Sequence, residues 1–273
     1  MILKNKSDLI HVGELAVGFS ENVLPDSGEL AGSEVKLYFE DGSITHYTFR
    51  DAHSLSWQTE RDEKVINENL ESYRATCPRS DFYFVDYVSK ETQASSISMV
   101  LDFSLGIATI LQGTLPTEKT AREDKLARVS AGLHQTAVDA VFRHASIGQP
   151  FAVVTPKHGT TTEMIGKRVK YVYSSKDAYE HIYLNENLYT WHCLSGIEKG
   201  MSDTELCHYY KIADQLFLFV WREKLVPTLG VIVLNLETMK TTGKIFGYDG
   251  EDFSRLCNFP IGAFAKLLNV TEY

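Results

Sequence analysis

The sequence predicts a mainly all-β protein made of two tandem antiparallel β-barrels joined by an amphipathic helix. Three observations lead to this prediction. Short segments alternate apolar and polar residues between turn signals, the same pattern returns further along the chain, and one intervening segment has helical spacing. We expect a strap over residues 1–29, a first barrel over 30–115, a helical connector over 116–162, and a second barrel over 163–273.

The first copy opens after a glycine-punctuated lead-in. Residues 35–39 and 44–49 alternate with period two and flank Asp41-Gly42, so they predict a hairpin whose tight turn needs positive φ angles. Further strand candidates are 53–58, 71–77, 81–89, 95–102 and 107–113. Seven short strands separated by turns are typical of an antiparallel barrel or sandwich.

The pattern then repeats at a nearly constant offset. Trp57 and Trp191 lie 134 positions apart, as do Gly32 and Gly166, and Gly113 and Gly247. An offset held across seven strand candidates indicates a duplicated unit.

The connector differs in kind from the two copies. The segment 120–123 has the spacing of a capping box, and apolar residues recur at helical spacing from Leu126 to Val141. This predicts the joining helix. A weaker helical pattern over 261–268 predicts a short C-terminal helix after Pro260.

Composition narrows the classes of function. The net charge of −9 and the absence of a run of basic residues argue against nucleic-acid binding. The start of the chain does not read as a signal peptide, and no stretch of about 18 apolar residues is present to cross a bilayer. Four cysteines without a C-x-x-C pair predict reduced thiols in a cytoplasmic protein. The sequence leaves a homodimer open.

Metal binding and cofactors are not expected. The pairs His192-Cys193 and Cys207-His208 invite a zinc interpretation, but adjacent strand residues point to opposite faces, so each pair could supply only one ligand. No phosphate-cradling glycine loop or cysteine cluster is present.

Strand alternation predicts which side chains enter the lumen. In the first copy Tyr47 and Phe49 share a face, which places His181 and Tyr183 inside the second barrel. Both copies turn their shared tryptophan inward. Phe217, Phe219, Trp221 and Glu223 share one face and Arg222 and Lys224 the other, while the matching segment 82–87 leaves the choice of face undecided.

The candidate catalytic residues are His181, Glu223 and Tyr183. His181 is either a hydrogen-bonded core histidine or a general acid/base, because imidazole titrates near neutral pH. Glu223 is either a carboxyl with a raised pKa in an apolar lumen or a rim carboxylate in a salt bridge.

The candidate ligand-binding residues are Trp191, Tyr209, Trp221 and Arg222. The three aromatic residues serve either as packing or as walls for a flat ligand. Arg222 could clamp a ligand carboxylate, since its planar fork suits bidentate contact, or it could lie at the surface.

Four segments resemble the molybdenum cofactor biosynthesis protein F (MoaF) family. They are 179–185, 189–196, 219–224 and 241–248, and residues 12–14 and 39–43 resemble the N-terminal part of the family. The likeness covers roughly residues 10–115 and 160–250. It implies tandem lipocalin-like (calycin) barrels and, by the family's name, an accessory role in molybdenum cofactor biosynthesis.

Two further functions remain open. In the first, a cofactor-independent enzyme (lyase, isomerase, decarboxylase or cyclase) moves a proton on a small hydrophobic or aromatic metabolite, expected to be acidic. In the second, the protein only binds that metabolite. A histidine, a carboxylate and a guanidinium near one apolar pocket favour the enzyme. Both hypotheses put the working pocket in the second barrel, with the first as a structural or regulatory copy.

Overall fold

The computed structural model describes residues 10–250 and 252–272 and divides into two compact units. One unit contains residues 24–114 and 140–159 and forms the first barrel. The other contains residues up to 23, residues 115–139 and residues 160–273, and forms the second barrel. The expected strap therefore lies partly outside the described residues, and so does the last residue of the expected second barrel.

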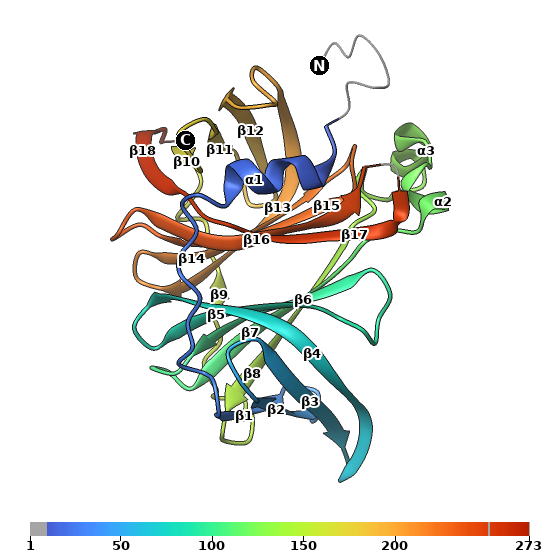
Figure 1. Ribbon diagram of the computed structural model, residues 1–273, viewed down its shortest axis with the longest axis vertical. Helices are drawn as coiled ribbons and strands as arrows, with labels where there is room; N and C mark the ends of the chain where they lie inside the picture. Colours follow the sequence, from blue (N-terminus) through green and yellow to red (C-terminus); the bar gives the residue numbers. More distant parts are fainter. Residues whose placement is uncertain (1–9, 251, 273) are drawn as a thin grey trace. The chain divides into compact units, whose positions relative to one another are not determined.

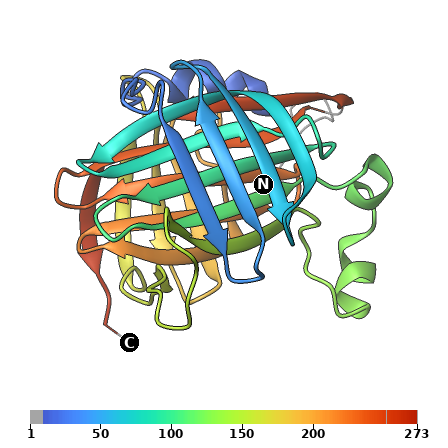
Figure 2. The ribbon, with the colours of Figure 1, turned by 90° about the horizontal axis from the view of Figure 1, so that it is seen from below.

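The first barrel is closed by eight antiparallel strands in chain order (Figure 1). The strands are β1 (Glu34–Phe39), β2 (Ile44–Phe49), β3 (Ser54–Arg61), β4 (Lys64–Arg79), β5 (Phe82–Val88), β6 (Ser95–Asp102), β7 (Ile107–Thr114) and β8 (Asp139–Ile147). Figure 2 shows β1, β2 and β3 side by side in blue. Pairing of β1 with β8 closes the ring, so no strand edge is left unpaired.

The second barrel follows the same plan with two additions. Its closed path runs β13-β14-β15-β16-β18-β10-β11-β12, and pairing of β12 with β13 completes it, while β17 pairs with β16 and β9 with β13. The strands are β9 (Gly159–Thr160), β10 (Lys167–Val172), β11 (Ala178–Tyr183), β12 (Leu188–Ser195), β13 (Ser202–Ala213), β14 (Leu216–Glu223), β15 (Thr228–Asn235), β16 (Lys240–Asp249), β17 (Asp252–Ile261) and β18 (Phe264–Val270). The chain thus forms two closed antiparallel barrels, as the sequence predicts.

Strand registers confirm the duplication. Tyr47 pairs with Trp57 in the first barrel, and His181 pairs with Trp191 in the second, so both partners are shifted by the same 134 positions. The turns between these strands are also equivalent. The Asp51 carboxylate accepts from the amides of residues 53 and 54, and the side-chain oxygen of Asn185 accepts from those of residues 187 and 188.

The sequence left undecided which face of β5 points into the barrel, and the core residues of the structure decide it. Val85 and Tyr87 belong to the core cluster of the first barrel, with Tyr83 packed against it, so this set points inward. On β14 the inward set is Phe217, Phe219 and Trp221. The pattern was ambiguous because the opposite faces of these strands are also largely buried.

The predicted joining helix is wrong over most of its length. Residues 117–131 hold two short helices, α2 (Glu118–Ala121) and α3 (Lys125–Ser130), capped by Thr117 and Asp124 and not by the expected capping box. The chain then turns at Gly132, whose φ is +75°. From residue 139 the chain forms β8. Its pairing with β1 satisfies the backbone hydrogen-bonding groups at that strand edge, and this outweighs the local helical spacing of the sequence.

The predicted C-terminal helix is also wrong. Residues 252–261 and 264–270 form β17 and β18, and β18 pairs with β10 to close the second barrel. Pro260 fits this arrangement because β17 pairs only with β16, and proline is tolerated on an edge strand.

The described part of the strap is not wholly irregular. It contains the 3-10 helix η2 (Val12–Glu14) and the short helix α1 (Leu15–Phe19), whose Phe19 is buried in the core of the second barrel unit. Every helix in residues 10–250 and 252–272 falls short of the length and hydropathy needed to span a bilayer.

Candidate functional site

The central strand of the candidate site is β11. Every second residue on it points into the barrel, and these inward side chains are aromatic or imidazole rings. His181 and Tyr183 are 3% and 0% exposed, so both lie inside the second barrel as predicted. In β11 the inward side chains sit between those of β10 and β12, since His181 pairs with Val169 on one side and Trp191 on the other.

His181 is surrounded by aromatic rings. Five ring centroids lie 4.6–6.0 Å from its own: Tyr171, Tyr183, Tyr189, Phe219 and Trp221. Its Nδ1 atom has no hydrogen-bond partner among the described residues. Burial lowers the pKa of His181 to about 3, so the imidazole is neutral at physiological pH.

A small cavity lies beside His181. Its volume is about 40 Å³, enough for one or two water molecules. Side chains of the barrel wall line it, together with Leu15 and Phe19 of α1. Phe19 stacks on Tyr173 at 4.2 Å and meets Tyr179 edge-on at 5.3 Å, so α1 contributes an aromatic ring to the aromatic wall.

Two carboxyl groups face this cavity. Glu223 accepts a hydrogen bond of 3.0 Å from the Trp221 indole, and Glu198 accepts one of 2.8 Å from the Tyr179 hydroxyl. Burial raises the pKa of both carboxyls, that of Glu223 to about 8, and each partner hydrogen bond only partly offsets the burial. Glu223 is therefore held largely protonated near neutral pH, and burial favours the protonated form of Glu198 as well.

Six of the seven predicted site residues point into the second barrel, four of them at the cavity and two in the packed core. His181, Trp191, Trp221 and Glu223 line the cavity together. Tyr183 and Tyr209 point inward but lie in the packed core, where the Tyr183 hydroxyl is within 2.6 Å of the Tyr171 hydroxyl and Tyr209 bonds Cys207.

Arg222 is the exception among the predicted site residues. It lies on the opposite face of β14 from Trp221 and Glu223, and its guanidinium donates to the Val138 carbonyl at 3.2 Å. The expected clamp for a ligand carboxylate is therefore not part of this cavity. Adjacent residues on a strand point to opposite faces of the sheet. Arg222 lies between the inward-facing Trp221 and Glu223, so its side chain points away from the lumen.

Several cavity residues escaped the sequence analysis. Glu198 lies in the turn between β12 and β13, and its position has no counterpart in the repeat pattern that would direct attention to it. Phe19 lies in the strap, whose apolar residues showed no usable periodicity. Tyr179 shares the inward face of β11 with His181, and alternation could have identified it.

The expectation that the second barrel would hold the principal pocket is not matched by cavity size. The interior of the first barrel contains a cavity of about 240 Å³, against about 40 Å³ in the second. The larger aromatic side chains of the second barrel fill its lumen. Tyr171, Tyr189 and Phe219 stand where the first barrel has Leu37, Leu55 and Val85.

Among the described residues, no cluster of three or more His, Cys, Asp or Glu side chains is arranged to hold a metal ion. His192 instead bonds Glu180 at 2.8 Å, and Glu180 also receives the guanidinium of Arg168 at 2.6 and 2.9 Å. The four cysteines are free thiols.

Comparison with known proteins places the chain in a family. The MoaF N-terminal domain model matches residues 7–117, and the MoaF C-terminal domain model matches residues 158–271. Protein MoaF of Klebsiella aerogenes is 40% identical over 273 residues and covers 99% of both chains. The chain belongs to the MoaF family.

Structural similarity adds little to this MoaF assignment. A crystal structure from Burkholderia vietnamiensis that carries a beta-lactamase name shares 10% identity, covers 39% of this chain and 96% of its own, and has a TM-score of 0.33. At that score the likeness supports no conclusion about chemistry.

Proposed function

We propose that this MoaF-family protein binds a small organic cation with an aromatic body in the second barrel. The observation that carries the proposal is the pairing of Glu198 and Glu223 on the wall of an aromatic-lined cavity. No lysine or arginine of the described chain lines that wall. A ligand ammonium would supply the missing positive charge and would be attracted to the ring faces.

The proposal replaces the expected acidic metabolite by one of opposite charge. The acid was expected because of Arg222, and that guanidinium lies on the other face of its strand. A ligand carboxylate would face two carboxyl groups and a neutral imidazole and would find no cationic side chain on the described wall. A cation would instead favour the carboxylate form of Glu198 and Glu223, because an adjacent positive charge stabilises an ionised carboxyl.

Phe19 supports an aromatic body for the ligand. Its ring stacks against Tyr173 inside the cavity wall, so the wall accommodates a phenyl group. The cavity of about 40 Å³ cannot hold a ligand ring in addition. We therefore expect the ligand to take the position of the Phe19 ring, and α1 to move when it does.

Isothermal titration with benzylamine tests the proposal, with benzyl alcohol as the uncharged analogue and phenylacetate as the anion. Glu198→Gln and Glu223→Gln should each weaken benzylamine binding about 10-fold or more and leave benzyl alcohol unchanged, since a charged hydrogen bond contributes about 1.5–3 kcal/mol. Glu163→Gln is the matched control, because its carboxylate pairs with Lys211 at the surface of the same unit. Equal binding of all three probes would contradict the proposal.

Phe19→Ala supplies a second test. Removing the ring should strengthen benzylamine binding, because the ligand no longer has to displace it. Weaker binding by this variant would show that the phenyl group supports the site and does not compete for it.

Proton-transfer catalysis on the same ligand is the second candidate function. It is favoured by Glu223, whose pKa of about 8 leaves both protonation states populated near neutral pH. Exchange of a ligand C–H proton with D2O, followed by NMR, should then be catalysed by the wild type and lost in Glu223→Gln. An accessory role in molybdenum cofactor biosynthesis rests on family membership alone.

A further inference from the structure

The interior of the first barrel carries a second cavity with a different lining. Its volume of about 240 Å³ approaches the roughly 300 Å³ of small-molecule sites in general. The apolar part of its wall includes Ile97, Ile110 and Val141. A groove of about 500 Å³ also follows the outward residues of β2, β3 and β4, but it lies outside the barrel.

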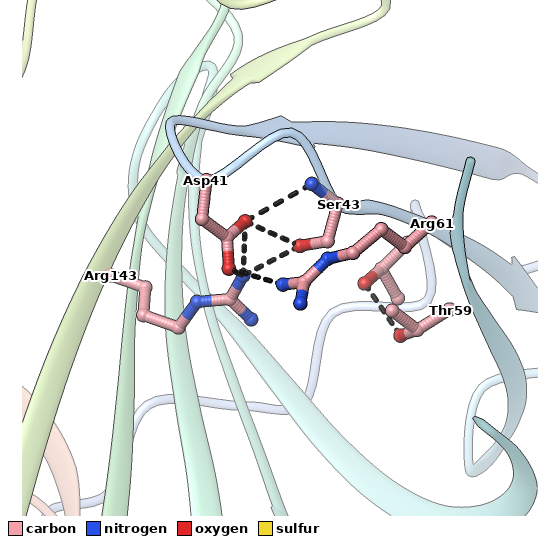
Figure 3. A network of polar contacts seen from close by, with 6 residues as sticks. Asp41, Ser43, Thr59, Arg61 and Arg143 are labelled. Carbon is pink, nitrogen blue, oxygen red and sulfur yellow. Dashed lines mark hydrogen bonds and ion pairs between the residues drawn. The ribbon is translucent and has the colours of Figure 1, made fainter. Parts of the chain in front are cut away.

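Arg143 of β8 brings a guanidinium to this cavity. Figure 3 shows its Nη2 atom directed at both oxygens of Asp41, each at 3.1 Å, and it also reaches the Ser43 hydroxyl at 2.7 Å. The guanidinium carbon lies 3.7 Å from the centre of the Phe39 ring. Side-chain packing on the ring and bonds to Asp41 thus hold the group in place.

Asp41 does not neutralise this guanidinium fully. The same carboxylate accepts from Arg61 at 2.9 Å, so two guanidinium groups share one negative charge (Figure 3). Partial burial acts to raise the pKa of Asp41, but the Ser43 hydrogen bonds and the two arginines together lower it. The three charged groups therefore carry one positive charge in excess.

The wall of the cavity also offers hydrogen-bond donors. Trp57 is 8% exposed, and its indole Nε1 has no partner among the described residues. The hydroxyls of Tyr47 and Tyr87 lie 3.3 Å apart, and burial raises the pKa of both, so both stay protonated. A buried indole N–H without an acceptor costs free energy that a ligand oxygen would recover.

We propose that this cavity is a second, separate binding site for a small aromatic carboxylic acid. The ring occupies the apolar part of the wall, and the carboxylate faces Arg143 and accepts from the donors of the wall. Glu91 also lines the cavity, where it accepts from Asn67 and forms no ion pair with Arg143 in the described chain. Its charge disfavours the reverse orientation of the ligand.

The proposal does not depend on the cation site in the second barrel. The two sites sit on equivalent frameworks, since Tyr47 and Trp57 correspond to His181 and Trp191 in register. Their charges differ, with Arg143 and Glu91 beside one cavity, and two carboxyls and no lysine or arginine of the described chain beside the other. We infer that the duplicated barrels have diverged toward ligands of opposite charge.

Titration of the full-length protein with 2-naphthoate, compared with uncharged 2-naphthamide, tests the second site. Arg143→Gln should weaken naphthoate binding about 10-fold to 100-fold and change naphthamide binding little. Trp57→Phe keeps the apolar ring but removes the donor, and should weaken naphthoate about 3-fold to 10-fold. Arg50→Gln is the control, because this arginine lies outside the barrel near Ser56.

Three results would overturn the proposal. The first is no naphthoate binding by a wild-type protein whose thermal melting shows it to be folded. The second is equal loss of naphthoate and naphthamide in Arg143→Gln, which would assign the effect to packing. The third is naphthoate binding that falls with Glu223→Gln but not with Arg143→Gln, which would place the acid in the second barrel.

Discussion

Replacing His181 by phenylalanine should remove much of the acid sensitivity of the second barrel. The folded imidazole has a pKa of about 3, whereas an unfolded histidine titrates near 6.5. Between these values the unfolded chain binds a proton that the folded chain does not. Stability therefore falls as the pH falls through this window, and His181 is the cause.

The magnitude follows from the linkage relation. Lowering the pH from 7.5 to 5 should decrease the free energy of unfolding of the wild type by about 2 kcal/mol through His181 alone. His181→Phe should lack this term. The variant should also gain about 1 kcal/mol or more at neutral pH, because it removes a buried Nδ1 that has no partner and keeps a ring in the aromatic surroundings.

Urea unfolding of both proteins at pH 7.5 and pH 5 provides the assay. Glu198, Glu205 and Glu223 face the same region and have raised pKa values, so they act in the opposite direction over this range. They are common to both proteins, and the difference between the two pH profiles isolates the imidazole. Identical profiles would refute the reasoning, as would an NMR titration in which the His181 ring protonates above pH 5.

Three further predictions concern the second barrel. Benzylamine binding at pH 7 should release a proton from Glu223, seen as a buffer-dependent titration enthalpy that Glu223→Gln abolishes, because the ligand charge lowers a pKa that starts at about 8. Gly230→Ala should destabilise the protein by about 1–3 kcal/mol in urea unfolding, since the added Cβ would lie 2.0 Å from an indole ring on the neighbouring strand. Lys224→Met should cost about 1–3 kcal/mol in urea unfolding, because it removes the ammonium that bonds the Asp203 carboxylate and the Thr204 carbonyl beside buried Glu205, whose pKa of about 9 keeps it protonated near neutral pH.

Much of the strand framework was readable from the sequence because strands such as β1, β2 and β3 are short, alternate in burial and are bounded by turns. The duplication supplied a second, independent reading of each strand, and this is why His181 and Trp191 were placed inside correctly. The same comparison could not decide β5 and β14, since alternation carries no information when both faces of a strand are apolar.

The closing strands were not readable, for a physical reason. Residues 126–141 and 261–268 have helical spacing, but β8 and β18 are fixed by pairing with β1 and β10. Such pairing joins residues more than 90 positions apart, and local patterns do not contain it.

The candidate site was predictable only in part. His181, Trp191, Trp221 and Glu223 follow from alternation along strands, and the structure brings them together. Glu198 comes from a turn, and its approach to Glu223 depends on how that turn folds over the barrel. Turn conformation is set by tertiary contacts more than by residue type, so no spacing rule identified it.

The interleaving of the two units along the chain has a practical consequence for making fragments. The first barrel lacks its eighth strand until residues 139–147 have been synthesised, although the matched N-terminal family domain stops at residue 117. A recombinant piece cut there would expose the unpaired backbone of β1, a ready template for intermolecular pairing. Expression trials of the isolated half should therefore extend past residue 147 to yield soluble material.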